Sequence, residues 1–204
     1  QDVPFPEDGY QGADIRVHME EYIAAQGGED ACKDLLEQTP EARKKVFVDY
    51  ALKKNLAGMH ADMARYGVHY DVWFSEQSLY DDGEIKSALK MLEDRGATYE
   101  KEGAIWFKTT DYGCEKDDVL IRNNGLPTYF MGDIAYHLNK FVTRGFDRSV
   151  NVWGADHHGH IARLKAAMEA AGVDPNRLDI VIMQLVRLVK DGEQVRMSKR
   201  AGKA

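Results

Sequence analysis

The chain has 204 residues, enough to bury a hydrophobic core and to form one or two domains. Hydrophobic residues make up 44% of it and charged residues 30%, which is typical of a globular protein and argues against a disordered or membrane-spanning chain. The net charge of −7 offers little of the positive charge that drives binding to nucleic acid, and Cys32 and Cys114 lack the spacing of a zinc site or disulfide scaffold and suit a cytosolic protein.

The first third of the sequence is predicted to be helical. Apolar residues recur at helical spacing over residues 13–25, and Gly27-Gly28 ends that helix. A second, long helix begins after Thr39, a good N-cap, with Pro40 at its first position, and runs to Gly67.

The middle of the sequence is mixed. Val72-Trp73-Phe74 is predicted to be a short strand, residues 84–94 an amphipathic helix, and residues 119–122 another strand. Residues 99–107 are predicted to form a hairpin that turns at Gly103.

The last third alternates strands and helices. We expect a helix from Thr128, a strand over 149–153, a helix over 156–171, a strand over 178–189 and a hairpin at Asp191-Gly192. Strand, helix and strand in this order favour a parallel α/β unit, whose ligands bind at the carboxyl ends of the strands. The turn after Trp153 is therefore the expected ligand site, although the sequence has no Walker A loop or GxGxxG element.

Tyr129 and Asp133 form the first candidate site. Thr128 can cap their helix, which places both side chains on one face, one turn apart. A phenol and a carboxylate in this arrangement could hold a planar cation. The alternative is that Tyr129 packs in the core while Asp133 complements the positive end of the helix.

The second candidate site is Trp153-Gly154-Ala155-Asp156-His157-His158-Gly159-His160. Gly154 would let a ligand approach the backbone, and Asp156 could cap the next helix or accept a hydrogen bond from a ribose. Helical geometry predicts that His157 faces the sheet, that His160 flanks that face and that His158 points to solvent. Adjacent histidines on one helix seldom converge on a metal, so no metal ligand is assigned, and a histidine-based metal hydrolase stays an alternative.

The third candidate site is Val195-Arg196-Met197-Ser198-Lys199-Arg200-Ala201-Gly202, which follows the Asp-Gly hairpin. Basic side chains around Ser198 could neutralise charge that builds up on phosphates in a transition state. The alternative is an ordinary solvated basic loop.

Together, and in this order, the three sites resemble class I aminoacyl-tRNA synthetases. Residues 196–200 are similar to their K-M-S-K-S loop, with Arg in place of the first Lys and the last Ser, and Gly154-Ala155-Asp156 to their Gly-x-Asp element. Tyr129 with Asp133-Ile134-Ala135-Tyr136-His137, the stretch 153–158 and Pro6-Glu7-Asp8-Gly9-Tyr10-Gln11-Gly12 resemble arginyl-tRNA synthetases in particular.

The resemblance implies an α/β fold, part of a Rossmann-like parallel-sheet domain with a mainly helical insertion. It places residues 1–70 in the helical insertion and residues 71–117 in a small mixed α/β connecting region. Residues 118–204 would be the second half of the catalytic domain, ending in the K-M-S-K-S-like loop.

The resemblance also implies a function. The enzyme would activate L-arginine with ATP and Mg²⁺ to arginyl-adenylate and transfer it to tRNA(Arg) in the cytoplasm, with no membrane partner. Arginine would be bound by Tyr129, Asp133 and His157. ATP would be bound by Gly154, Asp156, His160, Met197 and Lys199, and Lys199 and Ser198 would be the catalytic residues.

The sequence departs from the family pattern at its ends. The H-I-G-H element, the N-terminal tRNA-elbow domain and the C-terminal helical anticodon-binding domain are absent. We therefore expect an internal fragment that is inactive by itself. Three alternatives remain at this point: another nucleotidyltransferase of similar fold, a structural or interaction domain without activity, or the histidine-based metal hydrolase.

Overall fold

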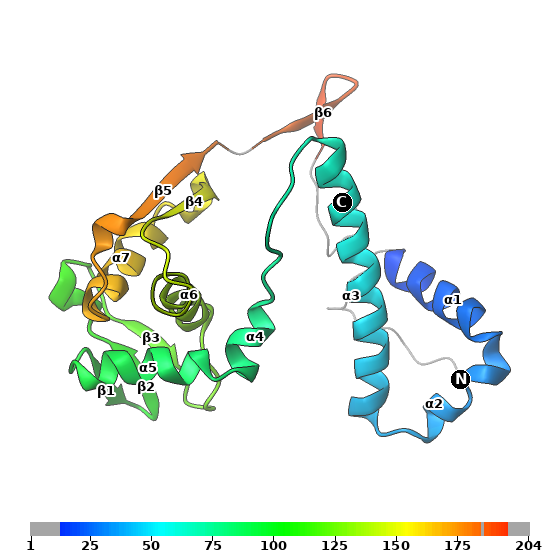
Figure 1. Ribbon diagram of the computed structural model, residues 1–204, viewed down its shortest axis with the longest axis horizontal. Coiled ribbons are helices and arrows are strands. Elements are labelled where there is room, and N and C mark those ends of the chain that lie inside the picture. The colour runs from blue at the N-terminus through cyan, green and yellow to red at the C-terminus, as the bar shows by residue number, and fades with distance from the viewer. Residues whose placement is uncertain (1–12, 185, 196–204) are drawn as a thin grey trace. The chain divides into compact units, whose positions relative to one another are not determined.

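The structure is a computed structural model that describes residues 13–184 and 186–195. The chain forms two compact units, residues 1–72 with 187–204, and residues 73–186 (Figure 1). Within the described ranges, no helix combines the length and the apolar character needed to cross a lipid bilayer.

Helices make up most of the first unit, as predicted. They are α1 (Asp14–Gln26), the 3₁₀ helix η1 (Glu29–Cys32), α2 (Asp34–Glu37) and the long α3 (Pro40–Arg65). Gly27 ends α1 with a φ of 97°, a conformation that glycine adopts without steric cost. Thr39 is confirmed as the N-cap of α3, because its hydroxyl accepts a hydrogen bond from the Ala42 amide at 3.3 Å.

Helices α1 and α3 contact each other through aromatic side chains. The ring of Tyr22 on α1 meets those of Phe47 and Tyr50 on α3 edge to face. His18 Nε2 also lies 2.8 Å from Asn55 Oδ1, at the margin of the contact. Neither helix has a fully buried residue, so this pair leaves most of its apolar surface exposed.

The predicted strand Val72-Trp73-Phe74 is wrong. The structure has no regular element between α3 and α4 (Glu76–Asp81), a helix that the sequence analysis did not predict. The β-branched and aromatic composition of the segment was the only signal, and a strand also needs a partner for its backbone groups. No described strand pairs with residues 72–74.

The second unit contains an antiparallel sheet of three strands. Strands β1 (Thr98–Lys101) and β2 (Ala104–Phe107) form the predicted hairpin, with positive φ angles at Glu102 and Gly103. Strand β3 (Asp118–Ile121) pairs with β2 on its other side. The antiparallel pairing of β3 departs from the parallel sheet that was expected for the domain of residues 118–204. The helix predicted over 84–94 is confirmed as α5 (Glu84–Asp94), and η2 (Thr109–Tyr112) joins β2 to β3.

A parallel pair of strands forms the other half of this unit. Strands β4 (Ser149–Gly154) and β5 (Leu178–Met183) are paired in parallel over six residues each, as predicted. They are linked by α7 (His160–Ala170) and the short η5 (Pro175–Arg177) and preceded by α6 (Tyr129–Leu138) and its π-helical continuation η3 (Asn139–Thr143). Figure 1 shows α6 and α7 beside these two strands.

The core of the second unit lies between the helices and the strands. Its fully buried side chains include Phe107, Leu120, Ile134, Leu164 and Met168. The other face of the parallel pair is open: Val150, Val152, Val181 and Met183 are exposed. Their register places all four on the same side of the two strands.

The predicted strand over 178–189 is interrupted. Strand β5 ends at Met183, and β6 (Leu188–Lys190) pairs instead with β7 (Glu193–Val195). The Asp191-Gly192 hairpin between them is confirmed, with φ angles of 52° and 84°. The pairing of β5 with β4 ends at Met183, and that of β6 with β7 begins only at Leu188, so the ladder is not continuous.

Candidate active site

A pocket of about 480 Å³ opens at the carboxyl end of β4. Helix α6 lines one side of it and the segment after β4, with the start of α7, lines the other. Its lining residues are Tyr129, Phe130, Asp133, Asp156, His157, Gly159, His160 and Arg163. The expected ligand position after Trp153 is therefore a real cavity, and five of the predicted site residues line it.

Thr128 sets the position of helix α6. Its hydroxyl accepts a hydrogen bond from the Met131 amide at 3.3 Å and donates one to the Val119 carbonyl at 2.8 Å. The first bond caps the helix and the second ties its start to β3. Both residues that Thr128 positions, Tyr129 and Asp133, follow within one turn and a half of helix.

Tyr129 and Asp133 are accessible from the pocket. Tyr129 is 85% exposed, so the interpretation that it packs in the core is wrong. The Asp133 side chain is 47% exposed. A carboxylate complements the helix dipole best in the first turn of a helix, and Asp133 lies beyond the first turn of α6. An exposed phenol and a half-exposed carboxylate on one helix face can receive a planar cation from the pocket.

The histidines lie differently from the prediction. Helix α7 begins at His160 rather than at Asp156, and residues 155–157 form the separate 3₁₀ turn η4. His157 is therefore exposed at the pocket and does not face the sheet, which corrects the helical-wheel interpretation. His158 is exposed, as expected. A 3₁₀ turn rotates side chains by a different angle per residue than an α-helix, so a wheel drawn through both places His157 wrongly.

His160 is the most enclosed of these histidines. Its side chain is 10% exposed, and its ring lies 5.4 Å, between ring centroids, from both Phe130 and Trp153. His160 Nε2 is 2.9 Å from Asp133 Oδ2, and Arg163 Nε donates to His160 Nδ1 at 2.6 Å. The sequence did not indicate that His160 and Asp133 meet, because they belong to different helices.

Gly154 and Asp156 follow one another at the end of β4. Gly154 is the last residue of the strand, and it does not line the pocket. Asp156 lines the pocket, and helix α7 has no side-chain cap, so the capping role that the sequence allowed for Asp156 is not observed. Its carboxylate is exposed, 3.6 Å from His157 Nε2, and is free to accept a hydrogen bond from a ligand.

Behind Asp133 lies a buried polar network that the sequence analysis missed. Lys140 Nζ donates to Asn151 Oδ1 at 3.2 Å, so the Asn151 amide nitrogen faces His137 Nε2, at 2.7 Å. His137 Nε2 must then accept, and its Nδ1–H donates to the Asp133 carbonyl oxygen at 2.7 Å. The network joins α6 to β4. The signal in the sequence was the spacing of His137, one turn after Asp133.

Burial controls the ionisation of this network. Removal from water lowers the pKa of His137 to about 4, and the nearby Lys140 ammonium adds to the effect. Burial likewise lowers the pKa of Lys140. His137 is thus held as a neutral ring at neutral pH, in the tautomer that its partners require.

The basic loop cannot be placed beside this pocket, because Met197, Ser198 and Lys199 lie outside the described residues. Within the described part of the chain, no three His, Cys, Asp or Glu side chains converge in a way that could hold a metal ion.

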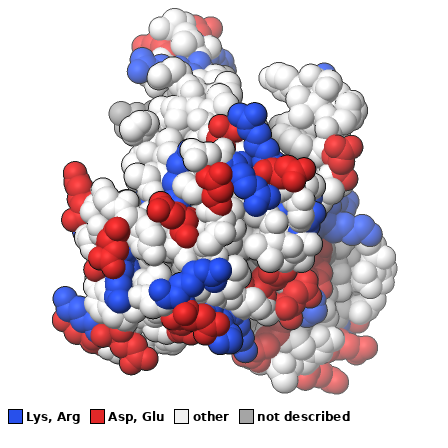
Figure 2. All heavy atoms as spheres, turned by 60° about the vertical axis from the view of Figure 1, so that its left-hand side comes forward, with Lys and Arg blue, Asp and Glu red and all other residues white. Residues whose placement is uncertain are grey.

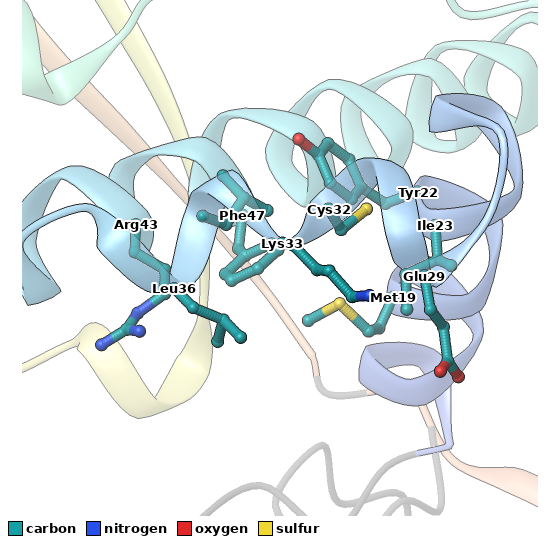
Figure 3. Close-up of a pocket in the computed structure, with 10 residues that line it drawn as sticks. Met19, Tyr22, Ile23, Glu29, Cys32, Lys33, Leu36, Arg43 and Phe47 are labelled. Atoms are coloured by element: carbon teal, nitrogen blue, oxygen red, sulfur yellow. The ribbon is translucent and has the colours of Figure 1, made fainter.

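A second pocket, of about 380 Å³, lies in the helical unit. Figure 3 shows Met19, Tyr22, Ile23 and Phe47 around it, together with the charged side chains of Glu29, Lys33 and Arg43. The ion pair of its lining residue Lys33 with Asp30, 2.6 Å between Nζ and Oδ1, joins two exposed side chains, whereas the pocket beside β4 contains the enclosed side chain of His160. The pocket beside β4 is therefore the candidate active site.

Comparison with known proteins places this geometry in context. Residues 7–204 match the family described as tRNA synthetases class I (R), catalytic domain. The chain is 56% identical over 202 residues to an arginine–tRNA ligase from Ruminiclostridium cellulolyticum and 57% identical to one from Caldanaerobacter subterraneus subsp. tengcongensis. Both matches cover 99% of this chain, which spans 35% of the length of each relative.

Solved structures of arginyl-tRNA synthetases have a similar fold. The fold superimposes on an arginyl-tRNA synthetase from Campylobacter jejuni with a TM-score of 0.82 and 37% identity, over 97% of this chain and 41% of that one. A Thermus thermophilus arginyl-tRNA synthetase matches with a TM-score of 0.59 at 18% identity, over 84% of this chain and 39% of that one, which supports the fold alone.

Proposed function

The chain belongs to the family of class I arginyl-tRNA synthetase catalytic domains, and from this premise we propose that the pocket beside β4 binds L-arginine for activation by ATP and transfer to tRNA(Arg). The single observation that carries the proposal is the exposure of Tyr129 and Asp133 together at that pocket. The chain spans 35% of its relatives, so the activity is that of a longer protein. Residues 1–204 alone are expected not to charge tRNA.

Asp133 is proposed to bind the arginine side chain. A guanidinium presents parallel N–H groups that match the two oxygens of a carboxylate, and lysine lacks this planar fork. Tyr129, one turn earlier, adds a phenol beside the same position. His157 is exposed at the opposite wall of the pocket and is proposed as a third arginine contact.

ATP is proposed to lie across the end of β4. The free carboxylate of Asp156 suits a ribose hydroxyl, and Gly154 allows the nucleotide to approach the strand end. His160 was predicted to contact ATP, but its contact with Asp133 favours the arginine side of the pocket. Met197 and Lys199, which follow β7 in the sequence, are proposed to contact the phosphates.

The chemistry would run in two steps. The arginine carboxylate attacks the α-phosphorus of ATP, and pyrophosphate leaves with its electron pair. The ribose hydroxyl of the terminal tRNA nucleotide then attacks the arginyl carbonyl and releases AMP. Positioning and charge neutralisation provide most of the rate in phosphoryl-type transfer, which suits Lys199 as a stabiliser of the leaving pyrophosphate, with Ser198 beside it.

Mg²⁺ would enter with ATP. This ion is usually held by one or two carboxylates together with phosphate oxygens. The described residues do not form a metal site of their own, so no step is assigned to the ion. The match of residues 7–204 to a synthetase catalytic domain favours this function over that of a histidine-based metal hydrolase.

No basic patch for tRNA is evident on the face of the described residues that Figure 2 shows. Figure 2 shows lysine and arginine interspersed with aspartate and glutamate on one face, and the net charge is −7. Binding of tRNA is therefore assigned mainly to the rest of the longer protein, which we propose acts in the cytoplasm.

Asp133→Asn tests the arginine assignment. The variant is made in a complete arginine–tRNA ligase, in which this chain replaces the matching 202-residue segment of the Ruminiclostridium cellulolyticum relative, called the complete enzyme below. Loss of one partner of a desolvated charge pair weakens binding by at least about 2 kcal/mol. Because Asp133 is 47% exposed, we expect Asp133→Asn to weaken arginine binding by an amount near this lower limit, about 2 kcal/mol or about thirtyfold in affinity. Binding of ATP should be unchanged.

Asp156→Asn in the complete enzyme is the matched control. It removes one charge from the same pocket and should weaken ATP rather than arginine. Isothermal titration of both ligands into both variants separates the roles. If Asp133→Asn leaves arginine affinity unchanged and lowers only the melting temperature, Asp133 is a structural residue.

A further inference from the structure

Four charged or polar side chains form a chain of contacts that ends at Asp133. Asp118 Oδ1 accepts a hydrogen bond from Arg163 Nη1 at 2.9 Å, and Arg163 Nε donates to His160 Nδ1 at 2.6 Å. His160 Nε2 lies 2.9 Å from Asp133 Oδ2. The contacts join β3, α7 and α6, all within the unit of residues 73–186.

The direction of these contacts is fixed by chemistry. A guanidinium has only donors, so Arg163 obliges His160 Nδ1 to accept. A neutral imidazole that accepts at Nδ1 carries its proton at Nε2, the nitrogen that faces Asp133. A second proton on the ring would need Nδ1, the atom that Arg163 already occupies.

Packing keeps the His160 ring in this orientation. Phe130 and Trp153 flank it at 5.4 Å between ring centroids, and Arg163 lies 4.7 Å from the centre of the Phe130 ring. His160 Nε2 is shielded from solvent and has no hydrogen-bond partner among the described residues, although it lies 2.9 Å from Asp133 Oδ2. Contacts of this kind tighten when a ligand closes the site.

Arg163 is itself anchored at its other end. Asp118 is mostly buried and receives, besides Arg163, a hydrogen bond from the Thr109 hydroxyl at 3.2 Å on its second oxygen. Thr109 is fully buried. The anchor therefore fixes the guanidinium beside His160, in the lining of the pocket.

We propose that Arg163, anchored by Asp118, is a positioning residue for arginine recognition: it holds His160 in the tautomer whose Nε2–H orients the Asp133 carboxylate towards the substrate. A carboxylate has about four acceptor positions, so one bond from His160 leaves about three for a guanidinium. The histidine also approaches Asp133 as a neutral donor, and it does not compete with the substrate as a second cation. The inference rests on the proposed function of Asp133.

Arg163→Met in the complete enzyme tests the proposal. Methionine keeps an unbranched stem against Phe130 but removes the donor to His160 and the pair with Asp118. We expect the KM for arginine to rise about tenfold, with kcat and the KM for ATP changed by less than about twofold. If Arg163 were purely structural, the variant would have a lower melting temperature, and the KM values for arginine and for ATP would change equally. That result would overturn the proposal.

Arg177→Met is the matched control. Arg177 also lies over a phenylalanine ring, 5.0 Å from that of Phe141, and it donates to the backbone carbonyls of Phe146 and Asp147. It does not line the pocket. The control should lower stability and leave the KM for arginine unchanged.

Nitrogen NMR gives a readout that does not depend on activity. In ¹⁵N-histidine-labelled residues 1–204, His160 should show a protonated Nε2 and an acceptor Nδ1, and Arg163→Lys should remove this pattern while keeping the charge next to Asp118. A wild-type ring protonated at Nδ1 would refute the proposal even if Arg163→Met did not fold. If Asp133→Asn weakens arginine binding and Arg163→Met does not, the positioning role fails alone. If Asp133→Asn has no effect on arginine binding, the proposed function fails.

Discussion

The neutral state of His137 makes the stability of the second unit depend on pH. The ring is 3% exposed, and its pKa falls from 6.5 to about 4 because burial disfavours the charged form. Charged groups that act on it are the Lys140 ammonium, which lowers its pKa further, and Asp133, which opposes the shift. Between pH 6.5 and about 4 the unfolded chain therefore binds a proton that the folded chain does not.

This difference sets both the sign and the size of the effect. The contribution of neutral His137 to the free energy of unfolding is complete above pH 6.5 and decreases as the pH falls. It is lost near the folded-state pKa of about 4. Each pKa unit corresponds to about 1.4 kcal/mol, so the full contribution is on the order of 3 kcal/mol, of which about 2 kcal/mol is lost by pH 5.

Urea unfolding followed by tryptophan fluorescence measures the effect. Trp73, Trp106 and Trp153 all lie within residues 73–186, so the signal reports the second unit. His137→Gln keeps an amide near the Nε2 position and has no titrating group. The stability of the wild type should fall relative to this variant by about 2 kcal/mol between pH 7 and pH 5.

His158→Gln is the control, because His158 is exposed and has no contact with the network. The His158→Gln variant should show the same dependence of the free energy of unfolding on pH as the wild type. A wild-type stability that follows His137→Gln at every pH, or an NMR titration of His137 with a midpoint near 6.5, would show that the ring is not held neutral.

Two further changes test how the fold positions the site. Thr128→Ala removes both the cap on the Met131 amide and the bond to the Val119 carbonyl, and should lower the free energy of unfolding by about 1–2 kcal/mol in urea melts, whereas Thr128→Ser should change it by less than half as much. Val152→Lys should leave the melting temperature of residues 1–204 nearly unchanged, because Val152 is 61% exposed, but should lower that of the complete enzyme, since parallel sheets are covered on both faces. Equal effects in the two proteins would show that this face is open in the complete enzyme as well.

Sequence patterns that span only a few neighbouring residues were sufficient to predict the local structure. The apolar periodicity over 84–94 predicted α5 with both of its bounds, and the capping residues Thr39 and Thr128 marked the starts of α3 and α6. Gly103 and Gly192 marked two hairpins, because a tight turn needs positive φ. These features are set within a few residues of chain, so the sequence alone determines them.

The sequence also identified most of the pocket. Tyr129, Asp133, Asp156, His157 and His160 all line it, because a strand followed by a helix in a parallel sheet puts its ligand site at the strand end. The family followed from the order of three short motifs and is confirmed by the match over residues 7–204. The roles of the individual residues remain proposals.

Only the tertiary structure decided which distant groups meet. Residues 72–74 have strand-forming side chains but pair with no strand that the structure describes, β3 joined an antiparallel sheet, and α7 began at His160. The contacts of Arg163 with Asp118 and of His160 with Asp133 link residues 45 and 27 positions apart. Such contacts depend on how whole helices pack on a sheet, and the periodicity of a single element carries no information about the side chains of another.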